Sequence, residues 1–169
     1  MNAQTNTQAT LPAVVRSVSV NAPIERAFAV FTESFAQWWP PAHHINPAGY
    51  VGAYIEPALG GRWYERAEDG SECDWGRVLE WQPPHRVRLS WHLNGEFTYD
   101  PDPAHASEVE VRFVAEGATR TRVEVEHRHF ERAVGGERLR QGVSQTGGWG
   151  QLVLRFADLI EGRDLTSVE

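Results

Sequence analysis

Two histidines extend a row of apolar side chains, and they are the residues in this sequence best placed for acid–base chemistry. In residues 119–130, apolar and charged side chains alternate as in a half-buried strand. The face expected to be buried carries Thr121, Val123, Val125, His127 and His129. In a cavity, an imidazole can orient a carbonyl or transfer a proton near neutral pH, so His127 is the candidate catalytic residue. The alternative is a structural histidine with satisfied hydrogen bonds.

His129 lies nearer the end of the same segment, and we expect it to be exposed. Together with His43 and His44 of a preceding loop, these histidines could in principle supply nitrogen ligands to a metal. No recognised ligand spacing supports such a site, and the single Cys73 excludes a multi-cysteine site within the chain. We therefore expect neither a metal nor a cofactor.

One acidic and one basic residue fall at positions that alternation places inside the molecule. Arg77 has the parity of Trp75, so it points inward unless a bulge intervenes, and it then needs an anionic partner. Glu65 has the parity of Trp63 and is the candidate partner. Such a pair could be structural or could bind the polar end of a ligand.

Aromatic side chains are abundant, with seven Trp, seven Phe and four Tyr among 169 residues. Indole rings can stack on a planar ligand or can simply fill the core. The loop around Trp39 and His43 could close the mouth of a cavity, or could anchor the loop to the sheet. The candidate ligand-binding residues are Trp39, His43, Trp63, Glu65, Trp75, Arg77, Trp91, His127, Trp149, Leu152 and Phe156.

The elements that must position these residues follow from hydrophobic periodicity. A first strand is predicted at 14–20, and short helical segments after Pro23 end before Trp38. A Gly-rich connector is expected at 135–148, and an amphipathic helix spans 149–160. Six further strands are predicted at 49–56, 61–66, 72–82, 85–93, 107–116 and 119–130. This order gives a two-layer α+β domain.

Composition and charge limit the classes of protein to which this chain can belong. The formal net charge of −7 disfavours a nucleic-acid partner. Because no apolar run approaches 18 residues and the first dozen residues do not resemble a signal peptide, we expect no membrane insertion and a cytoplasmic location. We expect a disordered arm at 1–12, one domain at 13–162 and a tail at 163–169.

Several runs in this order resemble the SRPBCC superfamily, which includes START and Bet v 1-like proteins. They are VSVNAPIERAF, WWPPAHH, GGRWYER, WGRVLEWQPP, TRVEVEH and a terminal helix with Gly-Trp. Within the superfamily, the chain is similar to bacterial single-domain proteins named after the activator of Hsp90 ATPase. The resemblance implies a helix-grip fold: a curved antiparallel sheet wrapped around a long C-terminal helix, with two short helices after the first strand.

The resemblance also implies a set of functions, because the superfamily binds lipids, hormones, polyketides or chaperones, and some members catalyse cyclisation or dehydration. Our leading hypothesis is non-catalytic binding of a small hydrophobic or aromatic molecule in a cavity between sheet and helix. A cyclase or dehydratase using His127 is the second hypothesis, and interaction with an Hsp90-type chaperone is the third. The sequence is compatible with a homodimer as well as with a monomer.

Overall fold

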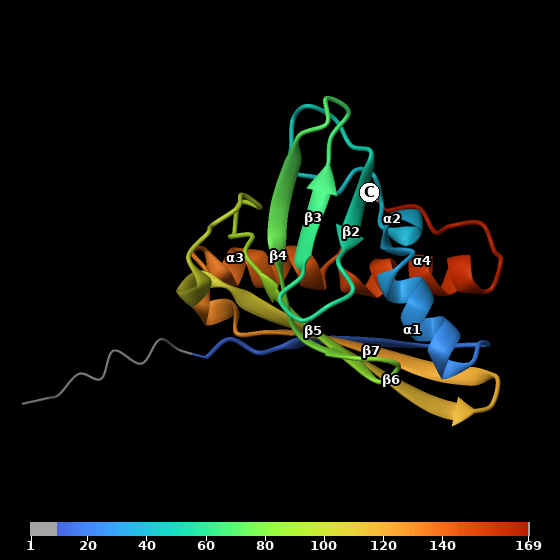
Figure 1. The fold of residues 1–169 in the computed structure, drawn as a ribbon. Helices are drawn as coiled ribbons and strands as arrows, with labels where there is room; N and C mark the ends of the chain where they lie inside the picture. The colour runs from blue at the N-terminus through green and yellow to red at the C-terminus, as the bar shows by residue number, and fades with distance from the viewer. Residues whose placement is uncertain (1–9, 169) are drawn as a thin grey trace, which may run out of the picture.

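Seven antiparallel strands form one curled sheet in the computed structural model, which describes residues 10–168 (Figure 1). The strands are β1 (Val14–Val20), β2 (Gly52–Ile55), β3 (Arg62–Arg66), β4 (Glu72–Gln82), β5 (Arg86–Trp91), β6 (Ser107–Gly117) and β7 (Arg120–Arg128). Their order in the sheet is β1-β7-β6-β5-β4-β3-β2. The meander from β2 to β7 is thus continuous, and β1 is added beside the last strand.

Helices lie on the concave side of this sheet (Figure 1). They are α1 (Ile24–Thr32), α2 (Phe35–Trp38), α3 (Gly136–Ser144) and α4 (Trp149–Ile160), with single 3-10 turns at Pro103–His105 and Phe130–Arg132. Both α1 and α2 contact α4, so the sheet and these helices enclose a common core. The predicted helix-grip fold is confirmed.

Helix α3 was not predicted, because residues 135–148 read as a Gly-rich connector. Glycine lowers helix propensity, and only Leu139 and Val143 give this segment an apolar face. Both side chains are buried, so tertiary packing stabilises a helix that local propensity disfavours. This helix matters for function because its C-terminal end borders the pocket described below.

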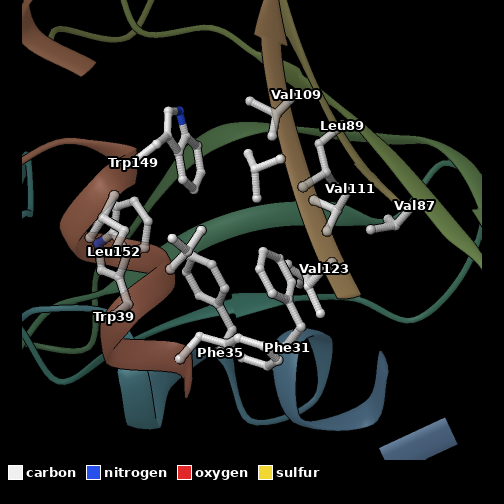
Figure 2. Close-up of a cluster of buried hydrophobic side chains, with 14 of the residues drawn as sticks. Phe31, Phe35, Trp39, Val87, Leu89, Val109, Val111, Val123, Trp149 and Leu152 are labelled. Carbon is white, nitrogen blue, oxygen red and sulfur yellow. The ribbon is translucent and has the colours of Figure 1, made fainter. Parts of the chain in front are cut away.

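The core consists of the inward faces of the strands packed against the helices. Figure 2 shows Trp149 and Leu152 of α4 beside valines of the sheet and aromatic rings from α1 and α2. The rings of Phe31 and Phe156 meet edge to face with centroids 5.3 Å apart, and Phe31 and Phe113 with centroids 5.8 Å apart. Full burial of such side chains stabilises the fold by roughly 1.5–3 kcal/mol each.

Strand β4 departs from regular alternation at two places, and this changes the direction of Arg77. Tyr64 pairs with Asp74 whereas Trp63 pairs with Gly76, so Trp75 is an extra, bulged residue. A Cβ on Gly76 would lie 1.7 Å from the carbonyl oxygen of Ser90, so this close approach requires glycine.

The prediction that Arg77 points inward is therefore wrong. Its side chain is 51% exposed on the convex face, where it lies 3.8 Å from Asp74. The same bulge places Leu79 on the outer side as well, and the second register shift, between Val78 and Glu80, turns Trp81 back toward the core. One bulged residue reverses the side-chain parity of the strand up to the next register shift.

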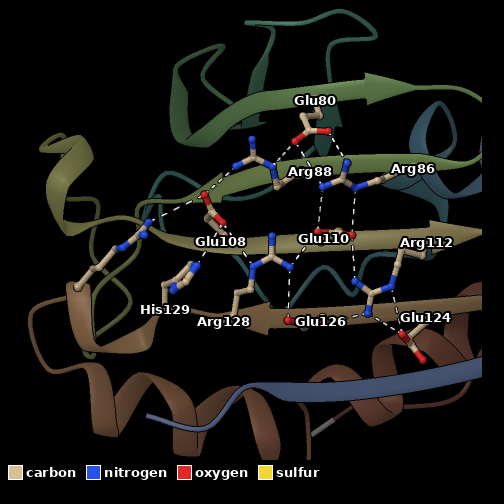
Figure 3. A network of polar contacts seen from close by, with 11 residues as sticks. Glu80, Arg86, Arg88, Glu108, Glu110, Arg112, Glu124, Glu126, Arg128 and His129 are labelled. Carbon is tan, nitrogen blue, oxygen red and sulfur yellow. Dashed lines mark hydrogen bonds and ion pairs between the residues drawn. The ribbon is translucent and has the colours of Figure 1, made fainter. Parts of the chain in front are cut away.

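The convex face of the sheet carries a lattice of alternating guanidinium and carboxylate groups (Figure 3). Glu110 lies at its centre and accepts hydrogen bonds from Arg86 and Arg112, with Arg128 at 2.8 Å. Burial opposes ionisation of this carboxyl group, but the three guanidinium groups outweigh it and lower the pKa of Glu110 to about 2. Its charge therefore stabilises the sheet.

Replacing Glu110 with glutamine is expected to lower the free energy of unfolding by about 2 kcal/mol at pH 7. Because the folded-state pKa is depressed, the contribution is present above about pH 4.5 and is lost as the pH falls toward 2. Urea denaturation should show a smaller difference in the free energy of unfolding between Glu110→Gln and the wild type at pH 3 than at pH 7. Glu116→Gln on the same strand, with a half-exposed side chain, is the control, and an equal loss there would contradict the assignment.

Candidate ligand pocket

A pocket of about 350 Å³ opens between the sheet, the loop after α2 and the segment that joins α3 to α4. Its lining residues are Trp39, Ala42, His43, His44, Ile45, Trp75, Trp91, Leu93, Phe97, Gly142, Val143, Gln145, Thr146, Gly147, Gly148, Trp149 and Leu152. The volume lies at the low end of the roughly 300–1,000 Å³ range of ligand pockets. It fits a compact small molecule.

Four indole rings form the inner wall of the pocket. The ring centroids of Trp39 and Trp75 are 5.3 Å apart, and those of Trp149 are 6.1 Å from both Trp39 and Trp91. These rings come from the α2 end, from β4 and β5, and from the first residue of α4. Segments distant in sequence thus converge on one aromatic surface, which offers ring faces and edges to a planar ligand.

The structure brings six of the eleven candidate ligand-binding residues to this pocket. They are Trp39, His43, Trp75, Trp91, Trp149 and Leu152. Trp63 and Phe156 are buried behind the wall: Trp63 packs against Trp75 and Trp91, and Phe156 packs against Phe31. Arg77 faces a separate groove on the convex side of the sheet.

His43 connects the two loops at the mouth of the pocket. Its Nε2 lies 2.8 Å from the carbonyl oxygen of Gly147, so that nitrogen carries the proton and donates it. The indole N–H of Trp39 in turn donates to the carbonyl of His43 at 2.9 Å. The loop after α2 is therefore fastened to the α3–α4 connector, and it lies at the pocket mouth, which is one of the two positions that the sequence left open for it.

Glu65 holds the pocket wall from behind instead of pairing with Arg77. Its fully buried carboxylate accepts the backbone N–H of Ile45 at 2.7 Å and of Asn46 at 3.3 Å, and the indole N–H of Trp75 at 2.8 Å. The expected Arg77 partnership is wrong because the bulge turns that arginine outward. Glu65 thus fixes both the loop and one tryptophan of the wall.

His127 is fully buried and lies behind the aromatic wall without lining the pocket. The indole N–H of Trp149 donates to Nδ1 at 3.0 Å, so the ring proton resides on Nε2, which faces Ser107 Oγ at 2.8 Å. Burial lowers the pKa of His127 to about 3, because desolvation disfavours the imidazolium. The ring is neutral at physiological pH.

This position argues against the catalytic interpretation of His127. Both ring nitrogens are engaged, and Trp91 and Trp149 pack against the imidazole with centroids 4.8 and 6.2 Å away. A general acid or base must reach the substrate directly or through one water. The structure instead matches the structural alternative, in which the histidine orients Trp149.

The four histidines considered as metal ligands do not assemble. His129 is partly exposed and lies 3.7 Å from Glu108 on the outer face, whereas His43 and His44 lie at the pocket mouth. Within residues 10–168, no group of three or more His, Cys, Asp or Glu side chains is arranged to hold a metal ion.

Several lining residues were missed by the sequence argument. Leu93 and Phe97 come from the loop between β5 and β6, and Gly142, Gln145 and Thr146 come from the end of α3 and its connector. An aromatic residue inside the turn-like segment LNGEFTY was the available signal for Phe97. The residues of α3 and its connector gave no such signal in the sequence, because the helix itself was not predicted.

The family described as "Activator of Hsp90 ATPase homolog 1-like protein" matches residues 21–161. The chain belongs to this family. The match runs from just before α1 to the end of α4, so it includes every residue that lines the pocket and every strand except β1. No curated protein matches this chain in sequence.

Several solved structures have the same fold as this Hsp90-activator-like family member. The anthrahydroquino-γ-pyrone synthase Txn09 is 39% identical, covering 89% of this chain and 97% of its own, with a TM-score of 0.62. CalC, a self-sacrificing resistance protein from Micromonospora echinospora, is 36% identical, covering 89% and 95%, with a TM-score of 0.65. The Hsp90 activator PFC0360w from Plasmodium falciparum is 19% identical, covering 90% and 97%, at a TM-score of 0.56, and shows the fold alone.

From residue 10 to residue 168, none of the helices in this family member has both the length and the apolar character needed to cross a membrane.

Proposed function

We propose that this protein binds a small planar aromatic molecule in the pocket walled by its four tryptophans. The observation that carries the proposal is the convergence of Trp39, Trp75, Trp91 and Trp149 on one cavity of about 350 Å³. A pocket lined by rigid aromatic rings favours a flat, rigid ligand over a flexible acyl chain, because stacking adds to the energy of burial.

The polar groups of the pocket are few and lie at its mouth. His43 is committed to Gly147 through Nε2, which leaves Nδ1 as an acceptor, and Gln145 and Thr146 add further polar atoms. This arrangement fits a ring system that carries hydroxyl or carbonyl groups at its edge. The name of the 39% identical synthase, which specifies an anthrahydroquinone-derived product, supports the same ligand class.

Titration with 1,8-dihydroxyanthraquinone tests the proposal, with quenching of tryptophan fluorescence as the readout. If each heavy atom contributes about 0.3–0.4 kcal/mol of binding free energy, this probe is expected to bind with a Kd in the micromolar range. Leu152→Phe places a larger side chain in the pocket and is expected to weaken binding at least about tenfold. Native mass spectrometry should report a one-to-one complex.

The matched control is Leu154→Phe on the same helix, because Leu154 is exposed and does not line the pocket. Its affinity for the probe should equal that of the wild type. Equal weakening in both variants, or no binding of the probe at millimolar concentration, would contradict the proposed function.

A further inference from the structure

Phe97 occupies an unusual position at the rim of the pocket. Its φ of 58° lies in the left-handed region, where a bulky residue is rare and strained. The residue is 40% exposed, and its ring lies over Gly142 of α3, where an added Cβ would stand 3.0 Å from the ring. Gly142 therefore leaves space for the ring of Phe97, whose backbone is held in a strained conformation.

The turn that carries Phe97 is built to hold this conformation. Asn94 accepts the N–H of Phe97 through its carbonyl at 2.9 Å, and its side-chain Oδ1 accepts the N–H groups of Glu96 and Thr98 at 2.9 and 3.1 Å. The N–H of Gly95 donates to the carbonyl of Val134 at 2.9 Å, which fastens the turn to the segment before α3. The position of the ring is thus fixed in advance of any ligand.

A second hollow adjoins the pocket at this ring. It measures about 490 Å³ and is lined by Gly95, Glu96, Phe97, Arg138, Gln141, Gly142 and Gln145. Phe97, Gly142 and Gln145 line both hollows, so Phe97 stands at their junction. The inner pocket is aromatic, whereas the outer groove is lined mostly by polar side chains.

Resting on the proposed function, we propose that the ligand has two parts: a planar aromatic core in the tryptophan-walled pocket, and a neutral, hydroxyl-bearing substituent that passes Phe97 into the outer groove. The groove offers donors on Arg138, amides on Gln141 and Gln145 that both donate and accept, and the acceptor Glu96. Arg138 lies 3.7 Å from Glu96, so the opposite charges offset each other and favour a neutral polyol over an anion.

Two probes with one aromatic core separate this inference from the proposed function. They are 1,8-dihydroxyanthraquinone and its 1-O-glucoside, titrated by tryptophan quenching. The wild type is expected to bind the glucoside about fivefold more tightly, as one or two net hydrogen bonds would give. In Arg138→Ala/Gln141→Ala this preference should vanish, while the Kd of the parent compound stays within about twofold. Both replaced side chains are exposed, so the variant should fold normally.

Phe97→Asn provides a second test, because asparagine tolerates left-handed backbone while the aromatic rim is lost. Stopped-flow dissociation of both probes should accelerate about tenfold, in line with the loss of one aromatic contact. Arg26→Ala, which removes an exposed charge on α1 away from both hollows, is the control and should leave both affinities unchanged.

Equal or weaker binding of the glucoside by the wild type, or a preference that survives in Arg138→Ala/Gln141→Ala, would overturn the two-part ligand while leaving the aromatic pocket in place. If neither probe binds, the proposed function fails and this inference fails with it.

Discussion

Replacing His127 with alanine is expected to lower the free energy of unfolding by about 4 kcal/mol at pH 7.5. The substitution leaves a cavity under the aromatic wall and removes the acceptor of the Trp149 indole N–H and the partner of Ser107. An unpaired buried donor costs about 1–3 kcal/mol in addition to the lost packing. Urea denaturation followed by circular dichroism measures the loss.

The same variant carries a pH signature that a purely steric residue would not show. Burial depresses the folded-state pKa of His127 to about 3, whereas the unfolded chain takes up the proton near pH 6.5. The stability that His127 contributes is therefore complete above about pH 6.5 and is lost as the pH falls toward 3. The difference between wild type and His127→Ala should shrink from about 4 to about 2 kcal/mol between pH 7.5 and pH 5.

His129→Asn is the matched control, two residues further along the chain. His129 is partly exposed and has a φ of 65°, a conformation that asparagine accepts, so the change should cost less than about 0.5 kcal/mol. A difference at His127 that does not change with pH would show that the imidazole is charged in the folded protein or is not enclosed as described.

The second large effect is expected at Glu65, which connects the pocket loop to Trp75. Glu65→Ala leaves the N–H groups of Ile45 and Asn46 and the Trp75 indole without their acceptor, at a cost of about 3 kcal/mol. Glu65→Gln should cost about 2 kcal/mol, because the amide oxygen can replace one carboxylate oxygen but the NH₂ group faces a donor.

Ligand binding should fall together with stability in these variants. Because Ile45 and Trp75 both line the pocket, loss of the carboxylate loosens two of its walls at once. The affinity for 1,8-dihydroxyanthraquinone, measured by isothermal titration calorimetry under conditions where the variant is folded, is expected to drop about tenfold in Glu65→Ala.

Glu68→Ala is a suitable control, since this exposed residue follows the same strand without contacting the pocket. It should leave affinity and stability near their wild-type values. Wild-type affinity in folded Glu65→Ala would show that the loop and Trp75 keep their positions without the carboxylate.

The elements were predictable wherever local pattern and tertiary environment agree. Strands 14–20 and 72–82 were predicted with the bounds that β1 and β4 have, and the apolar stripe of α4 was evident from its spacing. These segments have one clearly apolar face, and burial of that face determines their structure. Helix α3 was missed because its stability depends on packing of two side chains that local propensity does not report.

The pocket was partly predictable, and the failures have one physical origin. Trp39, Trp75, Trp91 and Trp149 were candidate ligand-binding residues, and all four line the pocket. Side-chain direction after a bulge cannot be read from parity, so Arg77 was placed inside the sheet when it lies outside. Periodicity likewise does not report how deeply a residue lies behind the pocket wall, which is why it left a cavity position and a structural position of His127 both open.

The pairing of β1 with β7 has a consequence for the order in which the protein can be assembled on the ribosome. Val20 pairs with Thr121, so the first strand must wait until about one hundred further residues have been synthesised. At roughly 5–20 residues per second, this takes on the order of 5–20 s, during which its apolar residues have no strand to join. Sheet closure is therefore a late, long-range event, and we expect folding to follow synthesis rather than accompany it.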